Sequence, residues 1–299
     1  MDNLYFRVAD ACFHIEFIDE EDNRNLLPSF PAFHLKEVPS EPLMFSLRVG
    51  KSLCNIAPEG EEVGQFDCGG ANHGIYKLPT GGYAMHISSP EGILSCILNT
   101  NADFTECQAT LIGDKEARQF GLNNAIMICF AFSGAHHNIL LIHASVPMID
   151  DKAYLFLGKS GTGKSTHCKL WLENFEKADL LNDDNPAIRV HSDGNIYVYG
   201  TPWSGKTPCY RALRRLIGGF LRLEQAPFNE IKRLHPVHAL ASVLSSCSTM
   251  VWDSPSYKKI CNTVTQVISR TPVFYLKNLP NKEAAEMSHA ALRPEDENN

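Results

Sequence analysis

Short runs of alternating apolar and polar residues dominate the first 120 positions of the chain. Three clear examples are residues 12–17, 43–49 and 92–98. Successive side chains of a strand point to opposite faces, so this period of two predicts strands with one buried face. Turns that contain Pro and Gly separate the runs, as at residues 79–82. The pattern therefore predicts a β-rich N-terminal domain over residues 1–121.

Longer apolar segments follow from about residue 122. Residues 139–146 and 153–157 are mostly apolar, which is typical of buried strands. Asp193-Gly194, between two short apolar runs, predicts a hairpin. The remaining segments predict a strand over 178–181 and helices over 123–132, 165–175, 236–246 and 257–269. Because helices and strands alternate, the sequence predicts an α/β domain over residues 122–299.

Composition narrows the class of protein. The 299 residues carry a net charge of −7 without a block of Lys or Arg, so we expect no nucleic-acid partner. Polar residues, including three His, interrupt the apolar stretch 125–149, which predicts a buried helix and strand and no membrane span. The first residues do not resemble a signal peptide. Ten cysteines without a C-x-x-C pair are typical of a reducing cytoplasm, where we expect the protein.

One segment matches the complete phosphate-binding pattern G-x-x-x-x-G-K-[ST]. It lies between the predicted strand 153–157 and the predicted helix 165–175, which is the context that the pattern requires. Its glycines let backbone N–H groups turn toward an anion, a lysine can bridge the outer phosphates, and a serine hydroxyl can bind Mg²⁺. The expected nucleotide-binding residues are Gly158, Lys159, Ser160, Gly161, Thr162, Gly163, Lys164, Ser165 and Thr166.

Asp183 and Asp184 follow the predicted strand 178–181. A nucleotide-phosphate site needs a carboxylate for Mg²⁺ near the end of a neighbouring strand. Two adjacent strand residues point in opposite directions, so one carboxylate can reach the metal and the other can accept a proton from a hydroxyl. The alternative interpretation is a solvated turn before Asn185-Pro186.

His143 lies in the predicted strand 139–146, ahead of the phosphate-binding segment. A single histidine in an apolar strand is commonly a packed, hydrogen-bonded core residue. A histidine at this place can instead contact a phosphoryl group or orient a carboxylate. Residue types alone leave both interpretations open.

Together, His143-Ala144-Ser145, the segment 158–166 and Asp183-Asp184 resemble the catalytic domain of HPr kinase/phosphorylase. That family has a P-loop fold related to ATP-dependent phosphoenolpyruvate carboxykinase. The resemblance extends over about residues 138–250. It implies a phosphoenolpyruvate-carboxykinase/HPr-kinase-like P-loop domain, which here follows a β-rich N-terminal domain.

The resemblance also implies a role for each residue. Asp183 would be the general base that deprotonates an acceptor Ser hydroxyl. Ser165 and Asp184 would bind Mg²⁺, Lys164 would bind the β- and γ-phosphates of ATP, and His143 would support the phosphoryl site. HPr kinases assemble as hexamers, so the resemblance implies a homo-oligomer, while the sequence itself fixes no number of subunits.

The chain departs from that family at three points. Thr166 stands where true HPr kinases carry an acidic residue, and their Glu-x-Arg-Gly signature is missing. The N-terminal region also differs from theirs. The acceptor therefore stays open as a protein, a peptide or a small molecule with a hydroxyl group.

The leading hypothesis is an ATP- and Mg²⁺-dependent kinase that transfers a phosphoryl group to such a hydroxyl. A phosphoenolpyruvate carboxykinase has a similar loop, but it needs a longer chain and a second metal site. A nucleotide-binding regulatory module without turnover is the non-enzymatic alternative. Retention of Lys164, Ser165 and the Asp pair favours the kinase.

Overall fold

The computed structural model describes residues 2–19, 24–57, 60–68, 71–205 and 207–293. The chain forms two compact units, each built on a large mixed sheet, so the predicted mixed α/β class is confirmed. One unit comprises Met1–His137 and Met250–Tyr257, the other Asn138–Thr249 and Lys258–Asn299. The division falls after residue 137 and not after residue 121, because the helix Lys115–Gly134, which spans residue 121, packs on the first sheet.

Nine strands form the sheet of the first unit within the described residues, in the order β3-β1-β2-β4-β9-β8-β7-β6-β5. The predicted runs 12–17, 43–49 and 92–98 correspond to β2, β4 and β8. The β2–β4 and β4–β9 pairs are parallel and the others antiparallel. The strands are β1 Asp2–Val8, β2 Ala11–Phe17, β3 His34–Leu35, β4 Leu43–Gly50, β5 Glu61–Cys68, β6 Ala71–Lys77, β7 Tyr83–Ser88, β8 Leu94–Thr100 and β9 Glu106–Leu111, with 3₁₀ turns η1 Arg24–Leu26 and η2 Pro31–Phe33.

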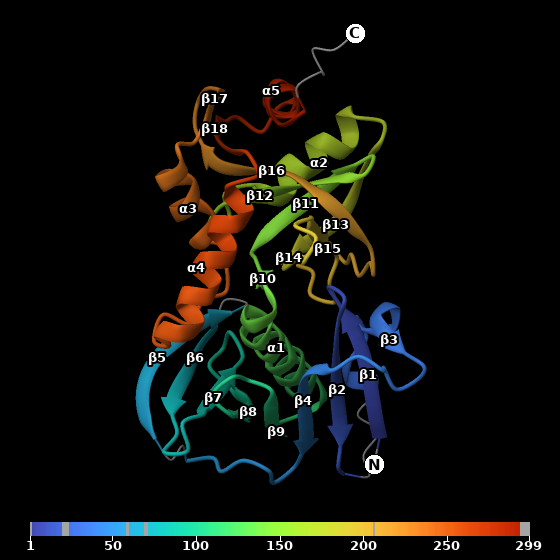
Figure 1. Ribbon diagram of the computed structural model, residues 1–299, viewed down its shortest axis with the longest axis vertical. Coiled ribbons are helices and arrows are strands. Elements are labelled where there is room, and N and C mark those ends of the chain that lie inside the picture. Colours follow the sequence, from blue (N-terminus) through green and yellow to red (C-terminus); the bar gives the residue numbers. More distant parts are fainter. Residues whose placement is uncertain (1, 20–23, 58–59, 69–70, 206, 294–299) are drawn as a thin grey trace. The chain divides into compact units, whose positions relative to one another are not determined.

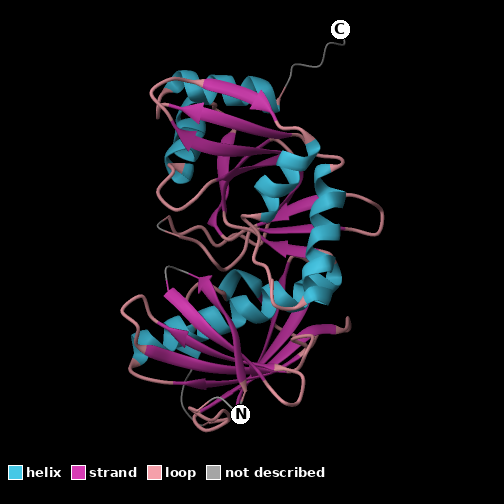
Figure 2. Ribbon diagram, turned by 90° about the vertical axis from the view of Figure 1, so that its left-hand side faces the viewer, coloured by secondary structure: helices cyan, strands magenta, loops and turns pink. Residues whose placement is uncertain are grey.

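Helix α1, Lys115–Gly134, crosses one face of this sheet (Figures 1 and 2). Its first turn is capped by Asp114, whose carboxylate accepts a hydrogen bond from the Ala117 amide at 3.0 Å. At Gly121 the helix comes so close to β8 that an added Cβ would lie 2.6 Å from the Ser95 carbonyl oxygen. Because of this contact, α1 belongs to the first unit. The helix also extends beyond the predicted range 123–132 at both ends.

The sheet of the second unit carries nine strands among the described residues. Seven follow the order β10-β14-β15-β16-β12-β11-β13, and β18 pairs with both β16 and β17. The predicted hairpin at Asp193-Gly194 is confirmed between β14 and β15. The strands are β10 Ile139–Leu141, β11 Ala144–Ile149, β12 Lys152–Leu157, β13 Ala178–Asp184, β14 Ala187–Val190, β15 Ile196–Tyr199, β16 Arg214–Gln225, β17 Glu230–Arg233 and β18 Val273–Asn278, preceded by the 3₁₀ turn η3 Ala135–His137.

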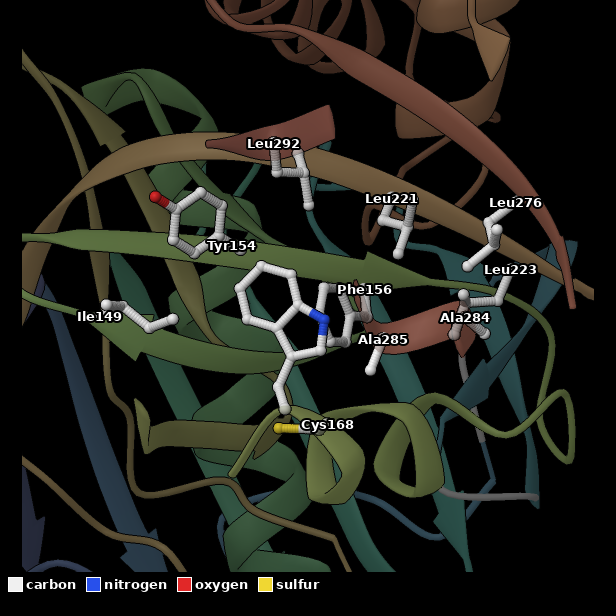
Figure 3. Packing of buried hydrophobic residues seen from close by; sticks show 11 residues of the cluster. Ile149, Tyr154, Phe156, Cys168, Leu221, Leu223, Leu276, Ala284, Ala285 and Leu292 are labelled. Carbon is white, nitrogen blue, oxygen red and sulfur yellow. The ribbon is translucent and has the colours of Figure 1, made fainter. Parts of the chain in front are cut away.

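The helices of the second unit are α2 Lys164–Asn174, α3 Pro236–Leu244, α4 Ser254–Ile268, whose first residues belong to the other unit, and α5 Lys282–Leu292. α2 and α5 pack on each other and on the sheet. Between them lies a buried cluster that includes Tyr154, Phe156, Leu221 and Leu223 (Figure 3). Trp171 of α2 is fully buried there. This core fixes α2, and with it the segment that leads into the helix, against the sheet.

β12, β13 and β16 end at the same edge of this sheet. β12 and β16 are parallel, while β11 is antiparallel to both β12 and β13. β13 therefore runs in the same direction as β12, and their carboxyl ends lie together. β11 begins at this edge. In the part of the chain that the structure describes, no helix has the length and apolar character needed to cross a membrane.

Candidate active site

The segment 158–163 connects β12 directly to α2. Gly161 and Gly163 have φ angles of +81° and +94°, a region that other residues adopt only with strain. A side chain at Gly158 would meet the Thr162 hydroxyl oxygen at 2.3 Å. The N-cap residue of α2 is Gly163, which has no side chain to cap the helix. The first amides of the helix therefore keep their capacity to bind an anion.

Lys164 is the first residue of α2, and only 8% of its surface is exposed. Its ammonium group donates hydrogen bonds to the carbonyl oxygens of Gly158 at 3.0 Å and Lys159 at 3.4 Å. Burial lowers the pKa of Lys164, Asp184 and Asp183 raise it, and the nearby Arg222 lowers it. A cation is thus held inside the loop at a place where burial disfavours its charge, so a bound anion would stabilise it.

Asp183 is 4% exposed and lies at the end of β13 against the loop. Its Oδ1 accepts hydrogen bonds from Ser145 Oγ at 2.5 Å and from Ser165 Oγ at 2.9 Å. The two hydroxyl oxygens are 3.4 Å apart. One carboxylate therefore connects β11, β13 and the first turn of α2. It lies next to Ser165, which the sequence predicts as a Mg²⁺ ligand.

A bulge in β13 makes this contact possible. Val146 of β11 pairs with Asn182, but the next residue, Pro147, pairs with Leu180, so Leu181 is left out of the register. Leu180 packs on the α2 side of the sheet. With regular alternation from Leu180, Asp184 and not Asp183 would share that side. The extra residue turns Asp183 toward Ser165.

Asp184 points away from the loop hydroxyls and has a 35% exposed side chain. Its Oδ1 lies 3.4 Å from His143 Nε2, and its Oδ2 accepts a hydrogen bond from Asn185 Nδ2 at 2.8 Å. Burial raises the pKa of Asp184, His143 and Lys164 oppose that rise, and Asp183 adds to it. A partly exposed carboxylate with a raised pKa is suited to accepting a proton.

His143 connects β10 to β11, and its side chain is 45% exposed. Its backbone amide donates to the Ser246 carbonyl oxygen at 2.8 Å, which fixes its position at the sheet edge. The exposure does not match a packed core histidine. The ring is placed to orient the carboxylate of Asp184.

The structure thus brings Lys164, Ser165 and Asp183 together, with Asp184 and His143 beside them. Asp183 and Asp184 are not in a turn, since β13 continues through both residues. Lys159, Ser160 and Thr166 are exposed, and within the described residues none of them forms a hydrogen bond or ion pair with either aspartate.

Two residues outside the expected set of site residues also support the site. The Gly205 amide donates to the Asp183 carbonyl oxygen at 2.6 Å, and an added Cβ on Gly205 would lie 3.0 Å from that oxygen. Gln225 Nε2 donates to the Gly161 carbonyl oxygen at 3.1 Å. Both contacts join segments that are distant in sequence, so residue types near Gly205 and Gln225 do not by themselves indicate them.

A metal ion bound at the candidate active site would have few protein ligands. Among the described residues, no group of three or more His, Cys, Asp or Glu side chains could hold a metal ion. Mg²⁺ is commonly bound by one or two carboxylates together with phosphate oxygens and water. The adjacent oxygens of Ser165 and Asp183 fit that kind of site and do not form a complete protein cage.

No family model and no curated protein matches the chain. Among solved structures, the HPr(Ser) kinase/phosphatase from Coxiella burnetii is similar over 51% of this chain and 88% of that chain, with 10% identity and a TM-score of 0.32. A similarity of this size does not establish a shared fold or function.

Proposed function

We propose that the chain is a phosphotransferase that moves the γ-phosphoryl group of ATP to the hydroxyl of a protein, peptide or small molecule. The observation that carries the proposal is the pair of adjacent carboxylates with different neighbours. Asp183 contacts the loop hydroxyl of Ser165, and Asp184 faces His143. Phosphoryl transfer needs both a metal-binding carboxylate and a group that receives the acceptor proton.

The loop and the start of α2 would bind the phosphates. Backbone amides around Gly161 and Gly163 supply neutral donors, and Lys164 supplies a charge close to them. The phosphate oxygens would replace the loop carbonyl oxygens that Lys164 contacts. Such a loop binds the phosphates and does not select the base. We propose ATP as the donor, and the assay would compare it with GTP and pyrophosphate.

Ser165 and Asp183 would hold Mg²⁺. When bound, the ion would neutralise charge on the phosphates of the donor. This assignment exchanges the roles that the family resemblance implies for the two aspartates. The hydrogen bond from Ser165 to Asp183 supports the exchange, because the carboxylate that binds Mg²⁺ in phosphate-binding loops lies beside the loop hydroxyl.

Asp184 would be the general base. The acceptor hydroxyl loses its proton to a carboxylate oxygen of Asp184, while its own oxygen forms a bond to the γ-phosphorus. The bond from that phosphorus to the oxygen shared with the β-phosphate breaks, and its electron pair leaves with ADP. His143 and Asn185 hold the carboxylate in place, and general-base assistance contributes roughly 10²–10⁴-fold to such steps.

The test is incubation of the protein with γ-labelled ATP, Mg²⁺ and cell lysate that has been separated into protein, peptide and metabolite fractions. Asp184→Asn serves as the control, because it leaves the loop intact. We expect label in one fraction with the wild type and little with the variant. Tight binding of Mg·ATP without transfer into any fraction would replace the kinase with a nucleotide-binding regulatory module.

A further inference from the structure

Arg222 lies on β16 at the same sheet edge as the phosphate-binding loop. It is the register partner of Leu157, the residue directly before Gly158. Its neighbours Leu221 and Leu223 belong to the core beneath α2 and α5 (Figure 3). Arg222 therefore points to the opposite face of the sheet.

Serines at the end of α3 hold the guanidinium group. Nε donates to Ser242 Oγ at 3.0 Å, and Nη2 donates to Ser245 Oγ and Ser246 Oγ, each at 3.0 Å. Nη2 also donates to the Ser242 carbonyl oxygen. All of these acceptors are neutral. Nη1 has no hydrogen-bond partner in the part of the chain that the structure describes.

Arg222 is half-buried, yet it forms no ion pair with a carboxylate among the described residues. Arg7, Arg48, Arg211 and Arg293 each pair with a carboxylate. Burial lowers the pKa of Arg222, so its charge is held in surroundings that disfavour it. A half-buried cation without a counter-charge has an unfavourable free energy, which a bound anion would offset.

One electrostatic effect and one shared hydrogen-bond partner connect Arg222 to the candidate active site. Its charge is close enough to lower the pKa of Lys164. Ser246, whose hydroxyl accepts from Arg222, also accepts from the His143 amide through its carbonyl oxygen. The guanidinium and His143 are therefore held by one residue, near the loop lysine.

We propose that Arg222 is a catalytic residue that contacts the transferred phosphoryl group through Nη1, with the serines of α3 holding it in position. The inference rests on the proposed phosphotransferase function and adds to it a third cationic component besides Lys164 and Mg²⁺. Charge spreads over the equatorial oxygens of the phosphoryl group during transfer, and an arginine that neutralises it can contribute about 10³–10⁵-fold to the rate.

A purely structural role would be to cap the C-terminus of α3, where cations bind carbonyl oxygens. That role explains the contacts of Nε and Nη2. It explains neither the missing counter-charge nor the position beside the loop, and it predicts a change in stability without a change in affinity for a mimic of the transferring group.

The experiment compares Arg222→Gln with the matched control Arg215→Gln, which removes an arginine of the same strand that contacts the Asp150 carbonyl oxygen instead. The probes are Mg·ADP alone and Mg·ADP with aluminium fluoride, a mimic of the transferring phosphoryl group, both measured by calorimetry. For Arg222→Gln we expect Mg·ADP affinity within about threefold of wild type and a loss of at least roughly 10²-fold in affinity for the fluoride complex. Arg222→Lys, which keeps the charge, should lie between the two.

Equal affinities of Arg222→Gln and Arg215→Gln for both probes would overturn the inference and leave Arg222 as a cap of α3. If Arg222→Gln fails to fold, Arg222→Lys and the double variant Ser245→Ala with Ser246→Ala provide the same comparison. Failure of the proposed function gives a different result, because wild-type protein would then bind neither probe, or would bind Mg·ADP with no gain in affinity when aluminium fluoride is added.

Discussion

The two adjacent aspartates of the second unit have opposite surroundings. Asp183 is almost completely buried and accepts hydrogen bonds from two serine hydroxyls, one of them in the first turn of α2. Asp184 has a 35% exposed side chain and lies beside His143, outside the loop. We call the first the loop side (Ser145, Ser165, Asp183) and the second the outer side (His143, Asp184, Asn185).

One strand end can therefore supply two chemical roles. The side chains of adjacent strand residues diverge, and the bulge at Leu181 decides which of them faces the loop. Burial among hydroxyls suits a carboxylate that stays fixed near a metal. Partial exposure beside a histidine suits one that receives a proton from a substrate. The following predictions test that division.

Lys164→Met should have the largest effect, because it removes the charge that both sides share. We expect Mg·ATP affinity to fall at least about 10²-fold and phosphoryl transfer to disappear. Titration calorimetry and the label assay measure the two quantities. Lys169→Met is the matched control, since Lys169 lies exposed on the same helix and pairs with Glu173. Unchanged affinity in Lys164→Met would contradict the phosphate-binding role of the loop.

Asp184→Asn should affect the outer side alone. We expect kcat to fall roughly 10²–10⁴-fold, because the proton acceptor is lost, while Mg·ATP affinity stays within about threefold. Steady-state kinetics with the acceptor fraction identified by the label assay provides the measurement. Full activity of this variant would return the role of base to Asp183 or to water.

His143→Gln should shift the pH dependence of transfer. Asp184 works as a base only when deprotonated, so activity rises as pH increases through its pKa. Burial raises that pKa and protonated His143 lowers it. Removing the histidine should therefore move the acidic limb of the pH–rate profile upward, by about one unit at most. A limb that moves downward would show that His143 does not act on Asp184 in this way.

Asp184→Asn should also have a small effect on stability. The pKa of Asp184 is higher in the folded protein than its ordinary value, so deprotonation is less favourable when folded. That cost is absent below the ordinary value of 3.8 and complete above the folded pKa. We expect a rise in Tm of about 1–3 °C near pH 7 that vanishes in acid, a modest size because the side chain is partly exposed. Thermal scans at both pH values measure it, and a lower Tm near neutrality would be the opposite result.

The parts of the site that lie within one continuous segment could be predicted from the sequence. The path from β12 through the glycines to Lys164 and α2 depends on neighbouring residues, and the structure has it as expected. The end of β13 at Asp184 was harder to predict, because Asn182 and the two aspartates have low strand propensity. Pairing with β11 stabilises the strand there.

Other features depend on partners that are distant in sequence. The bulge at Leu181 exists only in the register with β11, so no local pattern indicates that Asp183 faces the loop. β16 contains Gly218-Gly219 near its middle, and two glycines weaken the sequence pattern of a strand. The sequence therefore does not predict that Arg222 lies on a strand. Gln225 and Gly205 reach the site through contacts with residues far along the chain.

The most direct test of the division between the two aspartates is the Mg²⁺ dependence of ATP binding in Asp183→Asn and Asp184→Asn, measured by calorimetry at several Mg²⁺ concentrations. The account predicts that Asp183→Asn needs about 10–100-fold more Mg²⁺ than wild type for the same ATP affinity. It predicts that Asp184→Asn follows the wild-type curve. The reverse pattern, with the Mg²⁺ requirement changed by Asp184→Asn and unaffected by Asp183→Asn, would contradict the account.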